Sequence, residues 1–117
     1  MVVSKDFDEF VGRDLGAVVF VRDYLQFEFD PPPRMNIYAP ATVTCGHRSA
    51  TFGETAFANL LVAQIGKVVR GVELRRNEAL EVTFEDASRV SVSLLPDDAV
   101  GPEAVYLSLA DGRWLVL

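Results

Sequence analysis

The sequence predicts an α+β fold that is mainly antiparallel β, and two stretches with alternating hydrophobicity carry this prediction. In residues 80–95, apolar side chains occupy every second position on both sides of the polar turn Asp86-Ala87-Ser88. Residues 25–37 show the same pattern around a turn that begins at Asp30. A period of two on both sides of a turn indicates a hairpin with one buried and one solvated face. We therefore expect two hairpins whose apolar faces form the core.

An internal repeat, covering approximately residues 5–40 and 55–96, is the third observation behind the predicted fold. The matched pairs are Phe7/Phe57, Phe10/Leu60, Val11/Leu61, Leu15/Ile65, Gly16/Gly66, Val18/Val68 and Val19/Val69 at an offset of 50, and Leu25/Leu80, Phe27/Val82, Phe29/Phe84, Arg34/Arg89, Met35/Val90 and Ile37/Val92 at an offset of 55. Any two amphipathic segments of this kind look alike, but here glycines and turns coincide as well. We interpret the pattern as two α-β-β-β units related by a pseudo-twofold axis.

A short helix is predicted at the start of each unit. In the first, Ser4 is suited to cap a segment whose apolar residues within 7–11 share one face, and Gly16 is a terminator. In the second, Thr51 and Glu54 fit a capping box, and apolar residues follow at helical spacing over 57–65. We expect both helices to hold only by packing on the sheet.

The remaining segments of both units are predicted strands and turns. Residues 17–21 are apolar and β-branched, so we expect a strand buried on both faces, with residues 67–74 as its counterpart. Pro31–Pro33 lack backbone donors, which predicts a rigid exposed turn. The polar, β-prone segment 41–52 predicts a less buried strand, bent at Gly46.

A C-terminal hairpin completes the predicted fold. Residues 96–102 are rich in turn formers and indicate a solvated loop. Apolar and polar residues then alternate over 105–109, and Asp111-Gly112 is typical of a two-residue hairpin turn. Trp114 lies in the apolar last strand, where we expect core packing; a surface anchor is the alternative.

Length and composition indicate a single domain over residues 1–117. Half of the residues are hydrophobic and 24% are charged, as in compact globular proteins. The N-terminus shows no secretory signal, no apolar run approaches the ~20 residues that cross a bilayer, and Cys45 is the one cysteine. We expect a cytoplasmic, bacterial-type location in a reducing compartment.

The formal net charge of −6 restricts the classes of partner. Nucleic-acid binding requires clustered Lys and Arg, and an anionic membrane surface also attracts basic proteins, so we expect neither partner. The acidity favours a basic protein partner, or it serves solubility alone.

The residue types that carry chemistry are sparse. The one cysteine and the one histidine occur in Cys45-Gly46-His47, where a strand would place both side chains on one face. Catalytic Cys–His pairs usually come from distant segments, and a metal ion would require carboxylates such as Glu54 in addition. The sequence contains no glycine-rich phosphate loop and no nucleophile elbow. We expect no catalytic residues, no metal and no cofactor.

The second half resembles a family of small uncharacterised bacterial proteins with the pattern L-x-G-x-x-V, L-x-L-x-F-x-D-G-S-x-L-x-V and E-A-W. The matching stretches here are residues 61–69, 80–92 and 102–105, with Ala87 where glycine is common and Val105 where tryptophan is common. These motifs consist of turns and strand cores. The resemblance therefore implies a fold and no catalytic residues.

We expect a non-enzymatic protein-binding module, of the kind in which an immunity protein or antitoxin inhibits a bacterial effector. The alternative is a small-molecule-binding protein or small enzyme with a pocket between the two repeats. In that alternative, His47, Arg48 and Glu54 are the candidate binding residues. A homodimer built through edge strands or through Pro31–Pro33 is the third hypothesis.

Overall fold

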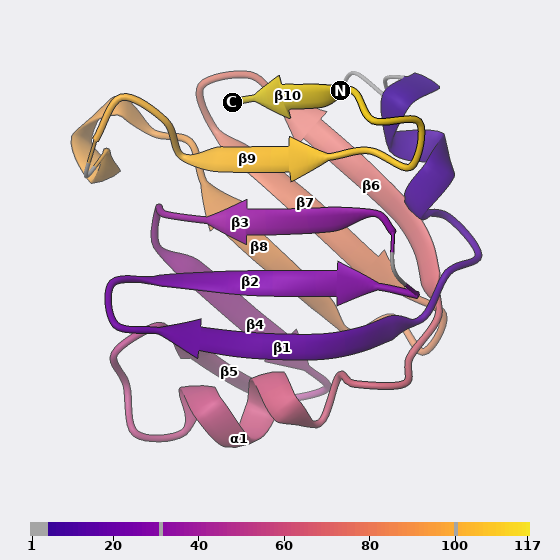
Figure 1. The fold of residues 1–117 in the computed structure, drawn as a ribbon. Coiled ribbons are helices and arrows are strands. Elements are labelled where there is room, and N and C mark those ends of the chain that lie inside the picture. Colours follow the sequence, from indigo (N-terminus) through magenta and orange to yellow (C-terminus); the bar gives the residue numbers. More distant parts are fainter. Residues whose placement is uncertain (1–4, 31, 100) are drawn as a thin grey trace.

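The chain folds into a sandwich of two five-stranded antiparallel sheets (Figure 1). A computed structural model describes residues 5–30, 32–99 and 101–117. The strands are β1 (Leu15–Val21), β2 (Tyr24–Phe29), β3 (Arg34–Ile37), β4 (Ala41–Cys45), β5 (Arg48–Thr51), β6 (Val69–Arg75), β7 (Ala79–Phe84), β8 (Arg89–Ser93), β9 (Val105–Ser108) and β10 (Trp114–Val116). The helical segments are α1 (Phe57–Val62) and the 3-10 helices η1 (Lys5–Phe10) and η2 (Pro96–Asp98). The mainly antiparallel β architecture is therefore confirmed.

Each sheet combines strands from both halves of the chain. The front sheet in Figure 1 has the order β1-β2-β3-β9-β10, and the rear sheet has the order β5-β4-β8-β7-β6. In the front sheet, the hairpin β9–β10 extends strands β1 to β3 through the pair β3–β9. In the rear sheet, the hairpin β4–β5 extends strands β6 to β8 through the pair β8–β4. At one corner the sheets are joined directly, because the Leu15 amide donates to Lys67 O and the Gly66 amide donates to Leu15 O.

The two predicted hairpins form as expected, and their apolar faces meet between the sheets. Leu25 pairs with Ile37 in the front sheet, and Leu80 pairs with Val92 in the rear sheet. All four side chains are at most 1% exposed. Burial at this level is the largest favourable contribution to folding, so the space between the sheets is a filled core.

Strand β1 differs from its prediction. It lies at the edge of the front sheet, and Val19 and Phe20 are 38% and 45% exposed rather than buried on both faces. Val19 points outward, where a two-layer sandwich has no third layer to cover it. Phe20 pairs with the buried Leu25 and faces inward at the open edge of the sheet. Phe20 instead packs edge-on against Phe57 of α1.

The segment 41–52 forms a complete hairpin, β4–β5, instead of a single bent strand. Gly46 has a φ of +62°, a left-handed conformation suited to a tight turn, and Val43 pairs with Ala50 across it. The hairpin joins the rear sheet through β4.

The helical segments are shorter than predicted. Ser4 lies outside the described residues, and η1 ends at Phe10, so that Val11 is 45% exposed. Helix α1 ends at Val62, and its N-cap is Ala56. Glu54 does accept a hydrogen bond from the Thr51 amide, at 2.5 Å, but the pair closes a turn ahead of the helix. In Figure 1, α1 and η1 lie at opposite ends of the sandwich.

Trp114 is the clearest departure from the predicted core. Its side chain is 61% exposed. Trp114 pairs with Ser108 and Leu115 pairs with Leu107, so the register with β9 turns Leu115 inward. The predicted turn Asp111-Gly112 is present, within the longer connection between Ser108 and Trp114.

Candidate functional site

Among the described residues, no helix covers the outer face of the front sheet (Figure 1). Aromatic side chains are concentrated on this face. Alternation along the strands points every second residue away from the core. The outward-facing residues are Ala17, Val19, Val21, Tyr24, Gln26, Glu28, Arg34, Asn36, Tyr38, Tyr106, Ser108, Trp114 and Val116. We call this set the aromatic face.

Two aromatic pairs lie on the aromatic face. The rings of Tyr106 and Trp114 stack with centroids 5.9 Å apart and planes 14° apart. The rings of Tyr24 and Tyr38 are 5.1 Å apart and tilted by 42°. Aromatic pairs at such distances stabilise each other beyond the area that they bury. Each pair therefore favours one relative orientation of its two rings.

Asn36 lies at the centre of this face, on the middle strand of the sheet. It pairs with Gln26 on one side and with Tyr106 on the other. Its Nδ2 lies 3.5 Å from the Tyr38 hydroxyl, and its buried Oδ1 has no hydrogen-bond partner among the described residues. A buried acceptor without a partner is costly, so this oxygen is an unsatisfied polar group beneath the aromatic face.

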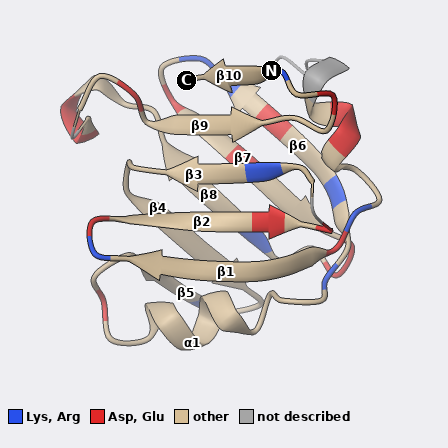
Figure 2. Cartoon of the chain, viewed as in Figure 1, with Lys and Arg blue, Asp and Glu red and all other residues tan. Residues whose placement is uncertain are grey.

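Charge is scarce on the aromatic face. Glu28 and Arg34, which are opposite each other on β2 and β3, are its charged residues. Figure 2 shows them as one red and one blue segment on a front sheet that is otherwise tan, with the remaining charges at the turns.

The outer face of the rear sheet has a different chemistry. Apart from Gly71 and Ala79, its outward positions hold hydroxyl and charged side chains, namely Thr42, Thr44, Ser49, Thr51, Glu73, Arg75, Glu81, Thr83, Arg89, Ser91 and Ser93. Arg75 Nη1 lies 2.6 Å from Glu73 Oε1, and the Thr42 and Thr51 hydroxyls are 2.9 Å apart. This face pairs its polar groups with each other, as expected of a solvated surface.

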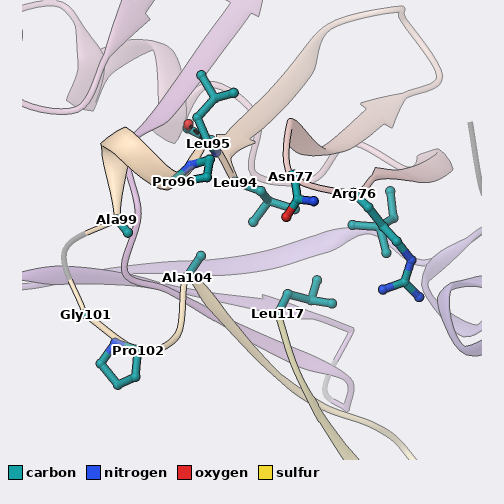
Figure 3. A pocket seen from close by; sticks show the side chains of 12 residues that line it. Arg76, Asn77, Leu94, Leu95, Pro96, Ala99, Gly101, Pro102, Ala104 and Leu117 are labelled. Atoms are coloured by element: carbon teal, nitrogen blue, oxygen red, sulfur yellow. Dashed lines mark hydrogen bonds between the residues drawn. The ribbon is translucent and has the colours of Figure 1, made fainter.

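Three surface cavities adjoin the sandwich. One of about 290 Å³ is lined mainly by aliphatic residues, among them Leu74, Leu94 and Leu117, with Arg76 and Asn77 at the adjacent turn (Figure 3). We call it the leucine cavity. A second, of about 230 Å³, is lined by Asp23, Tyr24, Leu25, Ile37, Tyr38, Ala39, Pro40 and Phe52. We call it the tyrosine cavity. The third, of about 420 Å³, lies between η1 and the edge of the rear sheet.

The candidate residues His47, Arg48 and Glu54 are not brought together. His47 is exposed in the β4–β5 turn, Arg48 begins β5, and Glu54 follows the other end of that strand. None of them lines the three cavities above. The core between the sheets is filled, so these residues do not form a pocket there.

Cys45 and His47 also take different environments. Cys45 is half-buried against the core, and its Sγ lies 3.8 Å from Lys67 Nζ, whereas His47 is exposed. Among the described residues, no three His, Cys, Asp or Glu side chains are placed to hold a metal ion.

A polar cluster surrounds Ser88, in the β7–β8 turn. The Ser88 hydroxyl is 2.7 Å from Gln64 Oε1 and 3.2 Å from Lys67 Nζ. Lys67 Nζ is also 2.7 Å from Asp86 Oδ2. Ser88 is 2% exposed and Gln64 is fully buried, and neither lines the three cavities, so the cluster anchors the turn against the segment after α1.

Sequence reasoning missed the aromatic face because it treats outward positions as solvated. The available signal was the residue type at those positions. Tyr106 alternates with the buried Val105 and Leu107, and Tyr24 and Tyr38 flank the first hairpin. Aromatic residues on a sheet face that is predicted to be solvent-exposed are typical of binding surfaces.

Comparison with protein-family models, with curated proteins and with solved structures finds no match to this chain. Among the described residues, no helix has the length and apolar character that a membrane span requires.

Proposed function

We propose that this chain is a non-enzymatic protein-binding module and that the aromatic face is its binding surface. The observation that carries the proposal is the contrast between the two outer faces. Both belong to five-stranded antiparallel sheets, but one carries three tyrosines and a tryptophan where the other carries Ser, Thr and paired charges. Solubility alone would favour the second chemistry on both faces.

The residue types on the aromatic face match those that dominate binding energies between proteins. Interface centres are enriched in Tyr, Trp and Arg and depleted of Lys, Glu and Asp. Trp114 is 61% exposed and Val116 is 45% exposed, and both lie beside Tyr106. Covering these side chains would remove apolar surface from water at about 25 cal/mol per Å². We infer that Trp114, Tyr106 and Arg34 are the principal contacts.

We further propose that the partner is basic. The chain has a net charge of −6, and Figure 2 shows few charges on the front sheet, with acidic and basic residues at the turns beside it. A net negative charge attracts a positively charged protein over distance, while the aromatic face itself carries only the pair Glu28 and Arg34. Inhibition of a basic bacterial effector is the specific role that this proposal favours, and co-expression with a candidate effector would test it by survival of the cell.

We infer that the fold arose from a duplicated unit. The two sheets have the same order of pairing, and the amide of Tyr38 donates to Ala104 O as that of Ser93 donates to Pro40 O. Strands β1 and β6 both have a bulge after their first residues, at Leu15 and at Val69. These positions differ by 54, and the proposed duplication therefore matches Leu15 with Val69, where the sequence pattern alone matched it with Ile65.

The test compares the protein with two variants in capture from the cell that produces it. Trp114→Ser removes the largest exposed ring of the aromatic face, and Thr83→Ser is a matched change on the outer face of the rear sheet. We expect one protein to be retained by the wild type and by Thr83→Ser and lost with Trp114→Ser.

Purified components then give the decisive measurement. The dissociation constant of the complex should rise by about 30-fold or more with Trp114→Ser, as expected for a residue at the centre of an interface. It should stay within about twofold for Thr83→Ser. A partner that binds both variants equally well would show that binding uses another surface.

A further inference from the structure

The tyrosine cavity lies where three connections meet at one end of the front sheet. Asp23 comes from the β1–β2 turn, Tyr38 from the segment after β3, and Phe52 from the segment after β5. Tyr24 adjoins Asp23 and packs against Tyr38, with ring centroids 5.1 Å apart. Three aromatic rings and one carboxylate therefore line a cavity of about 230 Å³.

The chemistry of these four side chains selects a cation. Aromatic rings present a negative face to a cation within about 6 Å of the centroid. The Asp23 carboxylate has no ion-pair partner among the described residues. Phe52 is 40% exposed although it is a large apolar ring, so the cavity opens to solvent beside it.

The leucine cavity provides an internal comparison, because it is built at the same topological positions in the other half. It is lined by Asn77 from the β6–β7 turn, by Leu94 after β8 and by Leu117 after β10. Aliphatic side chains replace the three rings, and the β6–β7 turn supplies Arg76 and Asn77 in place of a carboxylate (Figure 3). The aromatic and acidic lining is therefore specific to the tyrosine cavity and is not a consequence of the fold.

We propose that the tyrosine cavity binds the guanidinium group of an arginine side chain that the protein partner supplies. This inference rests on the proposed function, because Tyr24 and Tyr38 belong both to the cavity and to the aromatic face. Arginine fits better than lysine, since its planar group stacks on aromatic rings while it donates hydrogen bonds to a carboxylate. The free carboxylate and the basic partner are complementary in charge.

The test uses N-methylguanidinium chloride as the probe and the amide resonances of the ¹⁵N-labelled protein as the readout. N-methylurea is the neutral control of the same shape, and sodium chloride keeps the ionic strength constant. We expect saturable shifts confined to residues near 22–25, 37–40 and 52, with a dissociation constant on the order of 10 mM. N-methylurea should produce shifts at least about fivefold smaller at equal concentration, because it carries no charge.

Two variants and one control identify the groups responsible. Asp23→Asn keeps the shape of the exposed turn and should weaken binding about fivefold. Tyr24→Leu removes one ring and should weaken it by about two- to tenfold. Asp97→Asn deletes the same charge from η2 and should leave the dissociation constant within about twofold of the wild type.

Three results would each overturn the inference: equal shifts with N-methylurea, shifts outside the cavity, or unchanged binding to Asp23→Asn. A tenfold preference for tetramethylammonium would also overturn it, by indicating a free quaternary ammonium ligand instead of an arginine side chain. Failure of the arginine site can be distinguished from failure of the proposed protein-binding function. If the probe does not bind the cavity but Trp114→Ser still abolishes partner binding, the aromatic face remains the interface and the arginine site alone is wrong.

Discussion

The rings of Tyr106 and Trp114 lie nearly parallel on the front sheet, with centroids 5.9 Å apart and planes inclined by 14°. The register places them diagonally on neighbouring strands, because Trp114 pairs with Ser108 and Tyr106 pairs with Val116. Diagonal neighbours on one face of a sheet are within reach of aromatic side chains. The stack orients an indole that is 61% exposed, and orientation without burial is what a binding contact requires.

Trp114→Ser should therefore affect binding much more than folding. We expect the free energy of unfolding to fall by only about 0.5–1.5 kcal/mol, the worth of one aromatic pair. Phe84→Ala is the comparison, because Phe84 is 1% exposed and its truncation should cost about 3–5 kcal/mol. Urea unfolding followed by circular dichroism measures both values. Equal losses for the two variants would mean that Trp114 has a structural role.

Ala87 occupies a backbone conformation that favours glycine. Its φ is +72° in the β7–β8 turn, and its amide donates to Phe84 O at 2.9 Å. A left-handed conformation costs an alanine about 1–2 kcal/mol, part of which is offset by the lower flexibility of alanine in the unfolded chain. We expect Ala87→Gly to raise the free energy of unfolding by about 0.5–1 kcal/mol in urea denaturation.

Ala99→Gly is the control for this change. Ala99 has a φ of −66°, which any residue adopts. Glycine there only adds flexibility to the unfolded chain, so the free energy of unfolding should fall by about 0.4–1 kcal/mol. If Ala87→Gly also destabilised the protein, the left-handed turn would not be a source of strain.

Ser88 connects the buried Gln64 to the Lys67–Asp86 ion pair at the same turn. Its hydroxyl is 2.7 Å from Gln64 Oε1, which lies in a fully buried side chain. Ser88→Ala would leave that oxygen without its donor, at a cost of about 1–3 kcal/mol in unfolding free energy. Ser49→Ala is the matched control, since Ser49 is exposed and should change stability by less than about 0.5 kcal/mol. Similar effects of the two variants in thermal or urea unfolding would contradict the assigned role.

The hairpins β2–β3 and β7–β8 could be predicted because alternation and turn residues agree in them. The hairpin β4–β5 could not be predicted, because its short strands are polar and Gly46 is equally compatible with a bend in a single strand and with a hairpin turn. The pairing of β4 with β8 joins the two halves of the chain. Such a pairing depends on tertiary packing that a local pattern does not contain.

The local sequence pattern also could not predict whether the Trp114 side chain faces the core or the solvent. Trp114 to Leu117 are four consecutive apolar residues, so no period of two marks one side as buried. The pairing register with β9 determines the direction, because it places Leu115 opposite the buried Leu107 and so turns Leu115 inward. The same limit hid the tyrosine cavity, whose lining residues come from three connections that are distant in sequence.

Asp86 should make stability depend on pH. Its carboxylate is 2.7 Å from Lys67 Nζ and accepts the Ser88 amide at 2.9 Å. These hydrogen bonds hold the pKa of Asp86 well below its usual range, and the bond from Lys67 makes the largest contribution. A group whose pKa is lowered by folding contributes stability above its unfolded-state pKa of about 4 and loses it as the pH falls through the folded-state value.

The stability lost in Asp86→Asn should therefore be largest at pH 5–7 and should shrink as the pH falls below about 4. The Asp86 side chain is 49% exposed, so solvent screens the pair and the loss should be at most about 1 kcal/mol. Urea unfolding at pH 3, 5 and 7 measures this difference, and Asp97→Asn accounts for the change in net charge. A loss of equal size at pH 3 and pH 7 would show that shape, and not the carboxylate charge, is what this turn requires.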